Sequence, residues 1–417
     1  MSNLLEKASI ILTPTAYSDG DLHCIKPNTA TGDFDFTRST TATRENSSGN
    51  IESVAANLPR IDYLGGTAHI LFEPQSTNVT SNSEQPSTWH SNNNVAITTN
   101  ATTSPEGTTN SSLVVVDGSS GAVHTRNLCS FSSGSGTQTV TASCFLKYYN
   151  NQWVRLKSNF FTGSAANGKS SFFDIQNGVL GTVDATHTAK MENYGNGWYR
   201  CSITFDIDKD TDNVGYMQVE PMNDDNTSTY ASIGQGFYAF GSQGEELSFM
   251  TSYIPTGSSS VTRSADEANN SGSSDLINST EGVLYAELSV LNTASTIRAI
   301  TISDGSILNS VEILYLSNGN FGFRIRVNNV VEYLQTSALA DATQFVKAAI
   351  SYKSGDIKCF INGSEFNTNT TSFSFTNSLS ELAFDRGNGG NDFQGKVKSV
   401  AVFKEALTDT QLTSLTT

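Results

Sequence analysis

The sequence predicts an all-β protein in which two tandem antiparallel β-sandwich or jelly-roll domains follow an irregular, β-rich N-terminal region. Three observations predict this class. Only 15% of the residues are charged and 37% are hydrophobic, so uncharged polar residues fill much of the rest. Ser, Thr and Asn are poor helix formers because their side chains bond to nearby backbone in non-helical conformations. Short apolar runs alternate with turn residues, and this pattern occurs twice along the chain.

The first region, residues 1–75, contains short apolar stretches such as ASIILTPTAY and HILFEP, broken by turn residues. Its strand periodicity is weak, and no strong core can be read in it. We therefore expect part of this region to gain order by packing on partner subunits, as a region of attachment and oligomerisation.

The second region, residues 76–262, reads as short strands separated by Gly, Asn and Ser clusters, as in TVTASCFLKYY, QWVRLKSNFF and WYRCSITFDI. Strands of this length and spacing predict a sandwich or jelly roll. Residues 263–281 are poorer in hydrophobic residues and rich in Ser and Asn, which is typical of a linker.

The third region, residues 282–417, repeats the β-pattern, and four of its strands end in the Gly-containing turns SDG, SNG, KSG and NGS. Only the tail, ALTDTQLTSL, has a helical pattern. Thr408 is expected to be its N-cap, with Gln411 three residues later completing a capping box.

The charge and the hydropathy exclude several classes of function. The formal net charge of −16 repels phosphate backbones and anionic lipid, so neither nucleic acid nor a membrane surface is expected as a partner. No apolar run approaches the ~20 residues that span a bilayer, and the first residues do not read as a secretion signal. The five cysteines are widely spaced, which argues against a disulfide framework or a zinc site. We expect a protein that is made in a cytoplasm.

No catalytic motif stands out. A G-x-S-x-G sequence is absent, and the histidines are scattered. Glycosidases need two positioned carboxylates, and the E-x-D-x-E strand signature of laminarinase-type sandwich enzymes is missing as well. We therefore expect a protein that is not an enzyme.

Aromatic residues offer candidate sugar-binding positions, because their rings stack on the apolar faces of sugars while polar side chains bind the hydroxyls. The candidates are Tyr148, Tyr149, Trp153 and Tyr238. Tyr148 and Tyr149 are adjacent on a predicted strand and face opposite sides, so at most one of them is buried in the same core. The exposed ring then meets either a glycan or a neighbouring subunit.

An acidic run is a candidate calcium site. The sequence FDIDKDTDN places Asp206, Asp208, Asp210 and Asp212 two residues apart. On one face of a strand these carboxylates repel each other, and a hard cation could relieve the repulsion by bridging their oxygens. The EF-hand pattern fails, and the alternative is a solvated acidic loop. We expect no other cofactor.

Several motifs resemble those of known families. FDFTRSTTATRENSSGNIESVAANLPRIDY, followed by ILFEPQSTNVTSNSE, resembles the opening shared by many structural proteins of tailed bacteriophages. MENYGNGWYRCSITF and YAFGSQGEELSFMTSYIPTGSSSVTRSADEA resemble the carbohydrate-binding-module-like jelly roll of the same proteins. FVKAAISYKSGDIKCFINGSEF and FQGKVKSVAVFKEALTDTQLTSL are similar to concanavalin A-like sandwiches of the laminin-G or pentraxin type, although Phe345 and Val346 replace the expected Trp-His.

The resemblance has implications for single residues. The phage proteins repeat Trp89 and Trp198 as if they were core residues. They also repeat the two arginines of FTRSTTATR, Arg38 and Arg44, which implies docking to an acidic virion partner through bidentate contacts. The alternative for these arginines is a surface strand with salt bridges inside the chain.

Taken with this resemblance, the sequence predicts a virion protein of a tailed bacteriophage. It would be a fibre or decoration subunit that attaches through residues 1–75, forms a homo-oligomer, most simply a trimer, and binds host surface polysaccharide. Two alternatives remain open: a purely structural head-decoration or tail-connector protein, and a polysaccharide-degrading tailspike.

Overall fold

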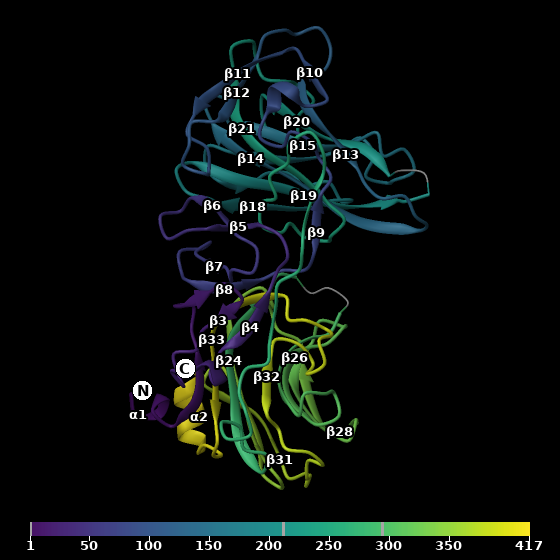
Figure 1. Cartoon of the computed structure of the whole chain (residues 1–417). Coiled ribbons are helices and arrows are strands. Elements are labelled where there is room, and N and C mark those ends of the chain that lie inside the picture. The colour runs from purple at the N-terminus through teal and green to yellow at the C-terminus, as the bar shows by residue number, and fades with distance from the viewer. Residues whose placement is uncertain (1, 211–212, 293–295) are drawn as a thin grey trace.

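The computed structural model describes residues 2–210, 213–292 and 296–417. Over these ranges the chain is almost entirely antiparallel β-structure, arranged as two β-sandwiches, one above the other in Figure 1. The helices of the described chain are short: α1 (Ser2–Leu5), α2 (Asp409–Thr416) and the 3-10 helices η1 (Ala30–Gly32) and η2 (Pro86–Thr88). None of these helices is long and apolar enough to cross a membrane. The predicted all-β class is confirmed.

The first sandwich packs two six-stranded sheets face to face. In spatial order, sheet 1 consists of β10 (Ser91–Asn93), β13 (His124–Ser130), β20 (Val214–Met222), β15 (Trp153–Asn159), β16 (Lys169–Asp174) and β17 (Val179–Leu180). Sheet 2 consists of β11 (Val95–Thr102), β12 (Ser111–Val116), β21 (Gly236–Glu245), β14 (Thr137–Tyr148), β19 (Trp198–Asp208) and β18 (Thr188–Asn193). One hydrophobic core lies between them.

The second sandwich packs an eight-stranded sheet against a five-stranded one. Sheet 3 consists of β31 (Ser364–Asn369), β30 (Ile357–Ile361), β29 (Val346–Lys353), β24 (Glu281–Val290), β33 (Gly395–Phe403), β8 (His69–Phe72) and β7 (Ile61–Asp62), with β1 (Ala8–Leu12) also on β33. Sheet 4 consists of β28 (Val330–Ser337), β27 (Phe321–Val327), β26 (Ser310–Tyr315), β25 (Arg298–Ser303) and β32 (Glu381–Ala383). Gly305, Gly319, Gly355 and Gly363 all have positive φ, as the predicted turns require.

Three smaller sheets lie among these elements. One consists of β2 (Tyr17–Ser18), β3 (Asp21–Leu22), β4 (Phe34–Thr37) and β23 (Glu267–Asn269). The other two are the pairs β5 (Ala42–Glu45) with β6 (Ile51–Val54) and β9 (Ser76–Asn78) with β22 (Val261–Arg263). Strands from before and after the first sandwich therefore pair with each other, so the chain enters and leaves that sandwich at one place.

The N-terminal region contributes to the second sandwich rather than standing alone. β1 and β8 pair with β33, and Ile10, Leu12, Ile70 and Phe72 lie in the core of that sandwich. We expected part of this region to take its order from partner subunits, but these strands take it from the same chain. The physical reason is that short strands without enough apolar residues for a core can add to the edge of another sheet. The division of the chain into domains at residues 75 and 262, and the role of residues 1–75 in attachment, stay predictions.

The C-terminal helix has the predicted start. The hydroxyl of Thr408 accepts a hydrogen bond from the backbone N–H of Gln411, whose side chain accepts one from the backbone N–H of Thr408. This capping box satisfies two of the free N–H groups at the start of α2. Leu412 and Leu415 of α2 pack in one hydrophobic cluster with Leu4, so the two ends of the chain lie together, as Figure 1 shows.

Five buried charged residues join the two sandwiches: Arg38, Arg60, Glu73, Arg263 and Asp266, called the junction cluster below. Asp266 pairs with Arg38 at 2.9 Å and with Arg60, while Glu73 pairs with Arg60 at 2.6 Å and with Arg263 at 3.4 Å. Burial raises the pKa of Glu73, but Arg263, Arg60 and hydrogen bonds from Ser252 outweigh it and lower the pKa to about 2. Glu73 is therefore ionised, and every charged side chain of the cluster has an oppositely charged partner within it.

The predicted linker takes part in this arrangement. Arg263 and Asp266 belong to the junction cluster, and β23 pairs with β4. Further along, Ile277 is buried in the core of the second sandwich. Residues 263–281 are thus packed against the rest of the chain, in spite of their polar composition.

Candidate functional site

Two of the three predicted sugar-binding tyrosines come together. β14 of sheet 2 ends at Tyr148, which is 36% exposed, and Tyr149 follows at 44% exposed. The rings of Tyr149 and Tyr238 meet edge to face, with 5.5 Å between centroids and 74° between planes. The side chain of Asn150 holds the turn by donating to Gly234 O (3.1 Å) and accepting from Gly236 N (2.8 Å). Tyr149 and Tyr238 form the tyrosine patch, a surface on which sugar rings can stack. Tyr148 lies on the opposite face of sheet 2, paired with Phe237 of the sandwich core.

The tryptophans that the sequence places in the core are there. Trp89 and Trp198 are 4% and 1% exposed. The indole N–H of Trp89 donates to Asn82 O at 3.0 Å, and that of Trp198 donates to Thr103 O at 2.9 Å. These rings stabilise the first sandwich and are not free to bind a ligand.

Trp153 lies on sheet 1, apart from the tyrosine patch on sheet 2. Side chains along a strand alternate between the two faces of a sheet. Val154 and Leu156 of β15 lie in the core of the first sandwich, so Arg155 and Lys157 lie on the outer face of sheet 1. Trp153 also faces outward and is half-buried.

Three side chains of this outer face form a row across neighbouring strands. The register places Gln218 of β20 opposite Arg126 of β13 on one side and opposite Lys157 of β15 on the other. Since neighbouring strands are ~4.8 Å apart, the backbones of the two cations are about 10 Å from each other. Among the residues that the structure describes, neither Arg126 nor Lys157 has an ion-pair partner, and Arg126 Nε has no hydrogen bond.

The carboxylate beside this row is compensated. Glu220 lies on the same face and is fully buried. It accepts hydrogen bonds from Arg155 Nε and from the amide of Gln218. Because the charge of Glu220 is balanced by Arg155, Arg126 and Lys157 are left to set a positive potential at this surface.

Two aromatic rings border Arg126. Its guanidinium carbon lies 4.4 Å from the ring centroid of Tyr216 and 5.3 Å from that of Phe160. Phe160 is half exposed and has a φ of 67°, whereas every other non-glycine residue with positive φ in the described chain is an asparagine. A bulky residue in this conformation costs about 1–2 kcal/mol, and such strain is concentrated at binding and catalytic sites.

The acidic run does not form a metal site in the part of the chain that the structure describes. Asp206 accepts a hydrogen bond from Thr139 Oγ1 at 2.6 Å, and Asp208 accepts one from Asp210 N at 3.0 Å. Asp212 lies outside the described residues. Among the described residues, no group of three or more acidic, His or Cys side chains could hold a metal ion. The calcium hypothesis stays a prediction, with a solvated acidic loop as its alternative.

The two candidate docking arginines have different surroundings. The side chain of Arg38 is fully buried and pairs with Asp266, so it holds the chain together rather than facing a partner. Arg44 Nε pairs with Glu52 at 2.8 Å, and the side chain of Arg44 is 17% exposed. For both residues the structure has salt bridges inside the chain. Docking through Arg44 stays a prediction.

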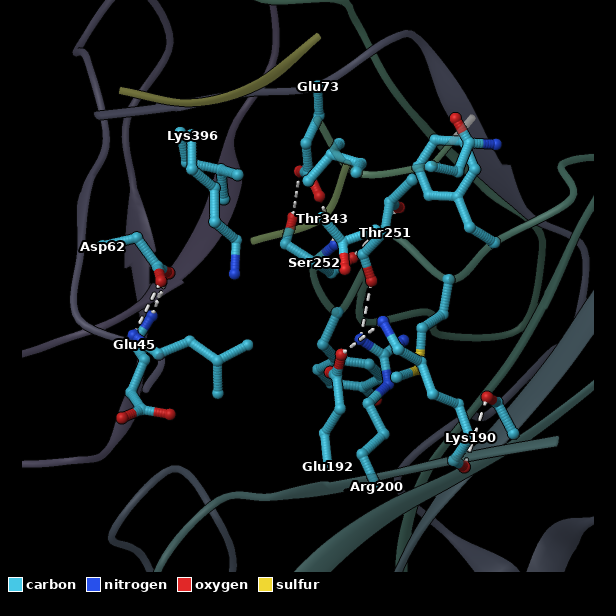
Figure 2. Close-up of a pocket in the computed structure, with 18 of the residues that line it drawn as sticks. Glu45, Asp62, Glu73, Lys190, Glu192, Arg200, Thr251, Ser252, Thr343 and Lys396 are labelled. Atoms are coloured by element: carbon cyan, nitrogen blue, oxygen red, sulfur yellow. Dashed lines mark hydrogen bonds and ion pairs between the residues drawn. The ribbon is translucent and has the colours of Figure 1, made fainter. Parts of the chain in front are cut away.

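A cavity of about 620 Å³ lies beside the junction cluster, between β5, β18, β19 and the edge of the second sandwich. Figure 2 shows Glu45 and Asp62 on one side, Glu192 and Arg200 on another, and the ammonium of Lys396 pointing into the open space. Burial, followed by the charge of Asp62, raises the pKa of Glu45 to about 7.

The protein itself holds one carboxylate of this cavity. The oxygens of Asp62 accept hydrogen bonds from the backbone N–H groups of Glu45 and Leu64, both at 2.8 Å, and His69 Nε2 lies 3.3 Å away. Burial raises the pKa of Asp62, but His69 and these N–H groups outweigh it and lower the pKa. Asp62 is therefore ionised, yet its oxygens are held by the protein and are not free to attack a sugar or a water.

Sequence reasoning did not find the outer face of sheet 1 or the junction cluster. The outer face had a signal, because WVRLKSN and GYMQVEP alternate apolar and polar residues, which predicts a strand with one polar face. The junction cluster had a weaker signal in the sequence, because its residues come from the motifs FTRSTTATR, PRIDY, ILFEPQ and VTRSADEA.

Residues 284–413 match the family model of the concanavalin A-like lectin/glucanases superfamily. This range covers most of the second sandwich, which is thus of the concanavalin A-like lectin or glucanase type, as the sequence predicts. No curated protein matches the chain in sequence.

Similar solved structures include domain 4 of AbnA, an extracellular GH43 arabinanase from Geobacillus stearothermophilus in complex with arabinotriose. It is 16% identical, with 37% of this chain and 73% of that chain covered and a TM-score of 0.31. The CBM40 of the Ruminococcus gnavus IT-sialidase is 16% identical, with 34% and 84% covered and a TM-score of 0.28. A SAP-like pentraxin from Limulus polyphemus is 13% identical, with 33% and 70% covered and a TM-score of 0.27. At these TM-scores the likenesses do not bear on what this chain binds.

Proposed function

We propose that this chain is a non-enzymatic virion protein of a tailed bacteriophage, a fibre or decoration subunit whose first sandwich binds host surface glycans. The observation that carries the glycan-binding part is the tyrosine patch. Tyr149 is 44% exposed, and an edge-to-face contact fixes the angle between the rings of Tyr149 and Tyr238. Exposed, pre-oriented rings lose little conformational entropy when a sugar stacks on them.

The virion part of the proposal rests on the sequence resemblance of the motifs from FDFTRSTTATR to VTRSADEA. A particle carries many copies of such a subunit, so weak binding at each patch becomes strong through avidity. A homo-oligomer, with a trimer favoured, fits this use. Sedimentation velocity of the purified chain measures that state, and a strict monomer would count against a fibre subunit.

The proposal is tested by the binding of the purified chain to an array of bacterial surface glycans. The double variant Tyr149→Ala, Tyr238→Ala should weaken binding about tenfold, because stacking of the apolar face of a sugar on a ring contributes about 0.5–1.5 kcal/mol per ring. Leu334→Ala is the matched control, since Leu334 is 46% exposed and lies on the second sandwich. If the tyrosine variant binds the glycan as tightly as the unaltered chain does, the tyrosine patch is not the glycan-binding site.

The same samples should be assayed for released reducing sugar. No release is expected, because the oxygens of Asp62 are held by backbone hydrogen bonds and by His69. Release that Glu45→Gln abolishes would instead support the polysaccharide-degrading alternative. Absence of both binding and release would support a purely structural decoration or connector protein.

A further inference from the structure

The outer face of sheet 1 has a charge that differs from that of the whole chain. The chain has 40 acidic residues against 24 Lys and Arg, yet Arg126 and Lys157 stand on this face without an ion-pair partner among the described residues. We propose that Arg126, Lys157, Tyr216 and Phe160 form a second saccharide-binding site, which takes a sugar that bears a carboxylate. The inference rests on the proposed function in that its ligand is a glycan, but it uses none of the residues of the tyrosine patch.

The row across the sheet provides the contacts to the ligand. Arg126 and Lys157 flank Gln218, so a saccharide laid across the three strands meets a cation at each end. The guanidinium of Arg126 forms a planar fork that matches a carboxylate, whereas the ammonium of Lys157 binds as a point charge. Asn159 Nδ2 donates to Gln218 Oε1 at 2.9 Å and so fixes the amide between the two cations.

The surroundings of the row keep its positive charge unscreened by protein groups. Glu220 is buried and compensated by Arg155. His124 lies on the same face two residues before Arg126, is 7% exposed, and has no hydrogen-bond partner at either ring nitrogen among the described residues. Burial, followed by the charge of Arg126, lowers the pKa of His124, so the ring is neutral at pH 7. The buried imidazole therefore adds no charge of its own to the row.

The aromatic rings give the site a wall. Tyr216 and Phe160 meet edge to face at 5.4 Å and 87°, and both lie over the guanidinium of Arg126. The hydroxyl of Tyr216 is held at 3.1 Å from His90 Nε2. The left-handed backbone at Phe160 positions an exposed ring at a conformational cost, and the fold does not need that ring in its core. A ring beside a carboxylate-binding arginine can stack on the apolar face of the sugar that carries the carboxylate.

A polymeric phosphate is a poorer fit than a carboxylated glycan. Two cations on one face of an acidic chain neutralise too few phosphates for nucleic-acid binding against a net charge of −16. Stacking of Phe160 and Tyr216 beside a single guanidinium fork instead suits one sugar ring with one carboxylate.

The test is calorimetric titration of the whole chain with three carboxylated oligosaccharides: oligogalacturonate, oligoalginate and hyaluronan fragments. Their methyl esters are the matched neutral ligands, because esterification removes the charge and keeps the sugar backbone. Saturable binding is expected to at least one acid and at least tenfold weaker binding to its ester. Arg126→Gln and Lys157→Gln should each weaken binding of the acid about tenfold or more, since a hydrogen bond to a charged group contributes about 1.5–3 kcal/mol.

Two controls make the result specific. Lys353→Gln removes one charge from an exposed residue of the second sandwich and should leave binding of the acid unchanged. The double variant Tyr149→Ala, Tyr238→Ala should also leave it unchanged. Equal binding of acid and ester, equal loss in Lys353→Gln, or no binding of any of the three acids would overturn the inference. If the glycan array shows binding that depends on the tyrosine patch while all acids fail, the proposed function stands and the second site falls.

Discussion

The junction cluster and the outer face of sheet 1 both contain arginines, but the charges are paired in the first and partly unpaired in the second. In the junction cluster three guanidiniums and two carboxylates are buried and paired with one another. On the outer face Arg126 and Lys157 are half-buried and unpaired, while the nearby Glu220 is already paired with Arg155. Buried charges need partners inside the protein to offset desolvation. The junction cluster therefore serves the structure of the chain. Unpaired cations at a surface remain available to a ligand.

The largest effect is expected from breaking the junction cluster. Asp266→Ala leaves Arg38 and Arg60 buried without one of their carboxylates, which should destabilise the chain by about 3–5 kcal/mol. Because the cluster joins the two sandwiches, scanning calorimetry of the variant should also show the two sandwiches unfolding in separate transitions. Asp275→Ala is the control, since Asp275 is exposed and in the same segment. A loss below about 1 kcal/mol would mean that the cluster does not hold the junction.

Phe160 provides a test of the outer face of sheet 1. Phe160→Asn should raise the free energy of unfolding by up to about 1 kcal/mol, because asparagine tolerates a φ of 67° better than phenylalanine does. The same variant should bind the carboxylated ligand more weakly, since it removes the ring beside Arg126. Urea unfolding and calorimetric titration of the variant measure the two effects. A variant that is less stable would show that the ring serves the fold instead.

Glu45, at the cavity beside the junction, should make stability depend on pH. Its pKa is about 7 in the folded chain against 4.5 as a free side chain, so folding favours its protonated form. The stabilising contribution is full below pH 4.5 and is lost as the pH rises to about 7. For this half-buried group the loss is on the order of 1 kcal/mol.

Glu45→Gln should flatten that part of the pH profile, because the amide does not ionise. Glu84, whose pKa burial and then the charge of Glu106 also raise to about 7, should keep a residual slope. Urea unfolding at pH 4.5, 6 and 7.5 measures the difference. Identical slopes in both proteins would show that Glu45 ionises freely in the folded chain.

Arg44 marks the edge of the buried region and should have the smallest effect. Its pair with Glu52 at 2.8 Å is partly exposed, with Glu52 38% exposed. Exposed ion pairs contribute about 0.2–1 kcal/mol, so Arg44→Gln should cost less than 1 kcal/mol in thermal unfolding, several times less than Asp266→Ala. A loss as large as that of Asp266→Ala would show that the partly exposed pair stabilises the chain as much as the buried junction cluster does.

The fold could be predicted further than the sites. Alternation and turn residues predict strands, and the spacing of Thr408 and Gln411 predicts the helix start. The partner of Arg38 could not be predicted, because Asp266 lies 228 residues away and only the pairing of β4 with β23 brings them together. The strained backbone of Phe160 has no sequence signal either, since asparagine or glycine is the residue expected there.

The outer face of sheet 1 shows the same limit. Alternation predicts that Lys157 and Gln218 each face away from a core, but their row with Arg126 depends on the register of three strands that are not consecutive in sequence. The aromatic composition indicates Tyr148 and Tyr149 as candidates, whereas it gives no sign of Arg126 and Lys157.

The most direct test of this account is equilibrium binding of the whole chain to paired neutral and carboxylated oligosaccharides in one competition experiment. A neutral glycan held by the tyrosine patch and a carboxylated glycan held by Arg126 and Lys157 are expected to bind together without displacing each other. Added salt is expected to weaken only the second. Mutual displacement, or failure of both ligands to bind at millimolar concentration, would contradict the presence of two separate sites.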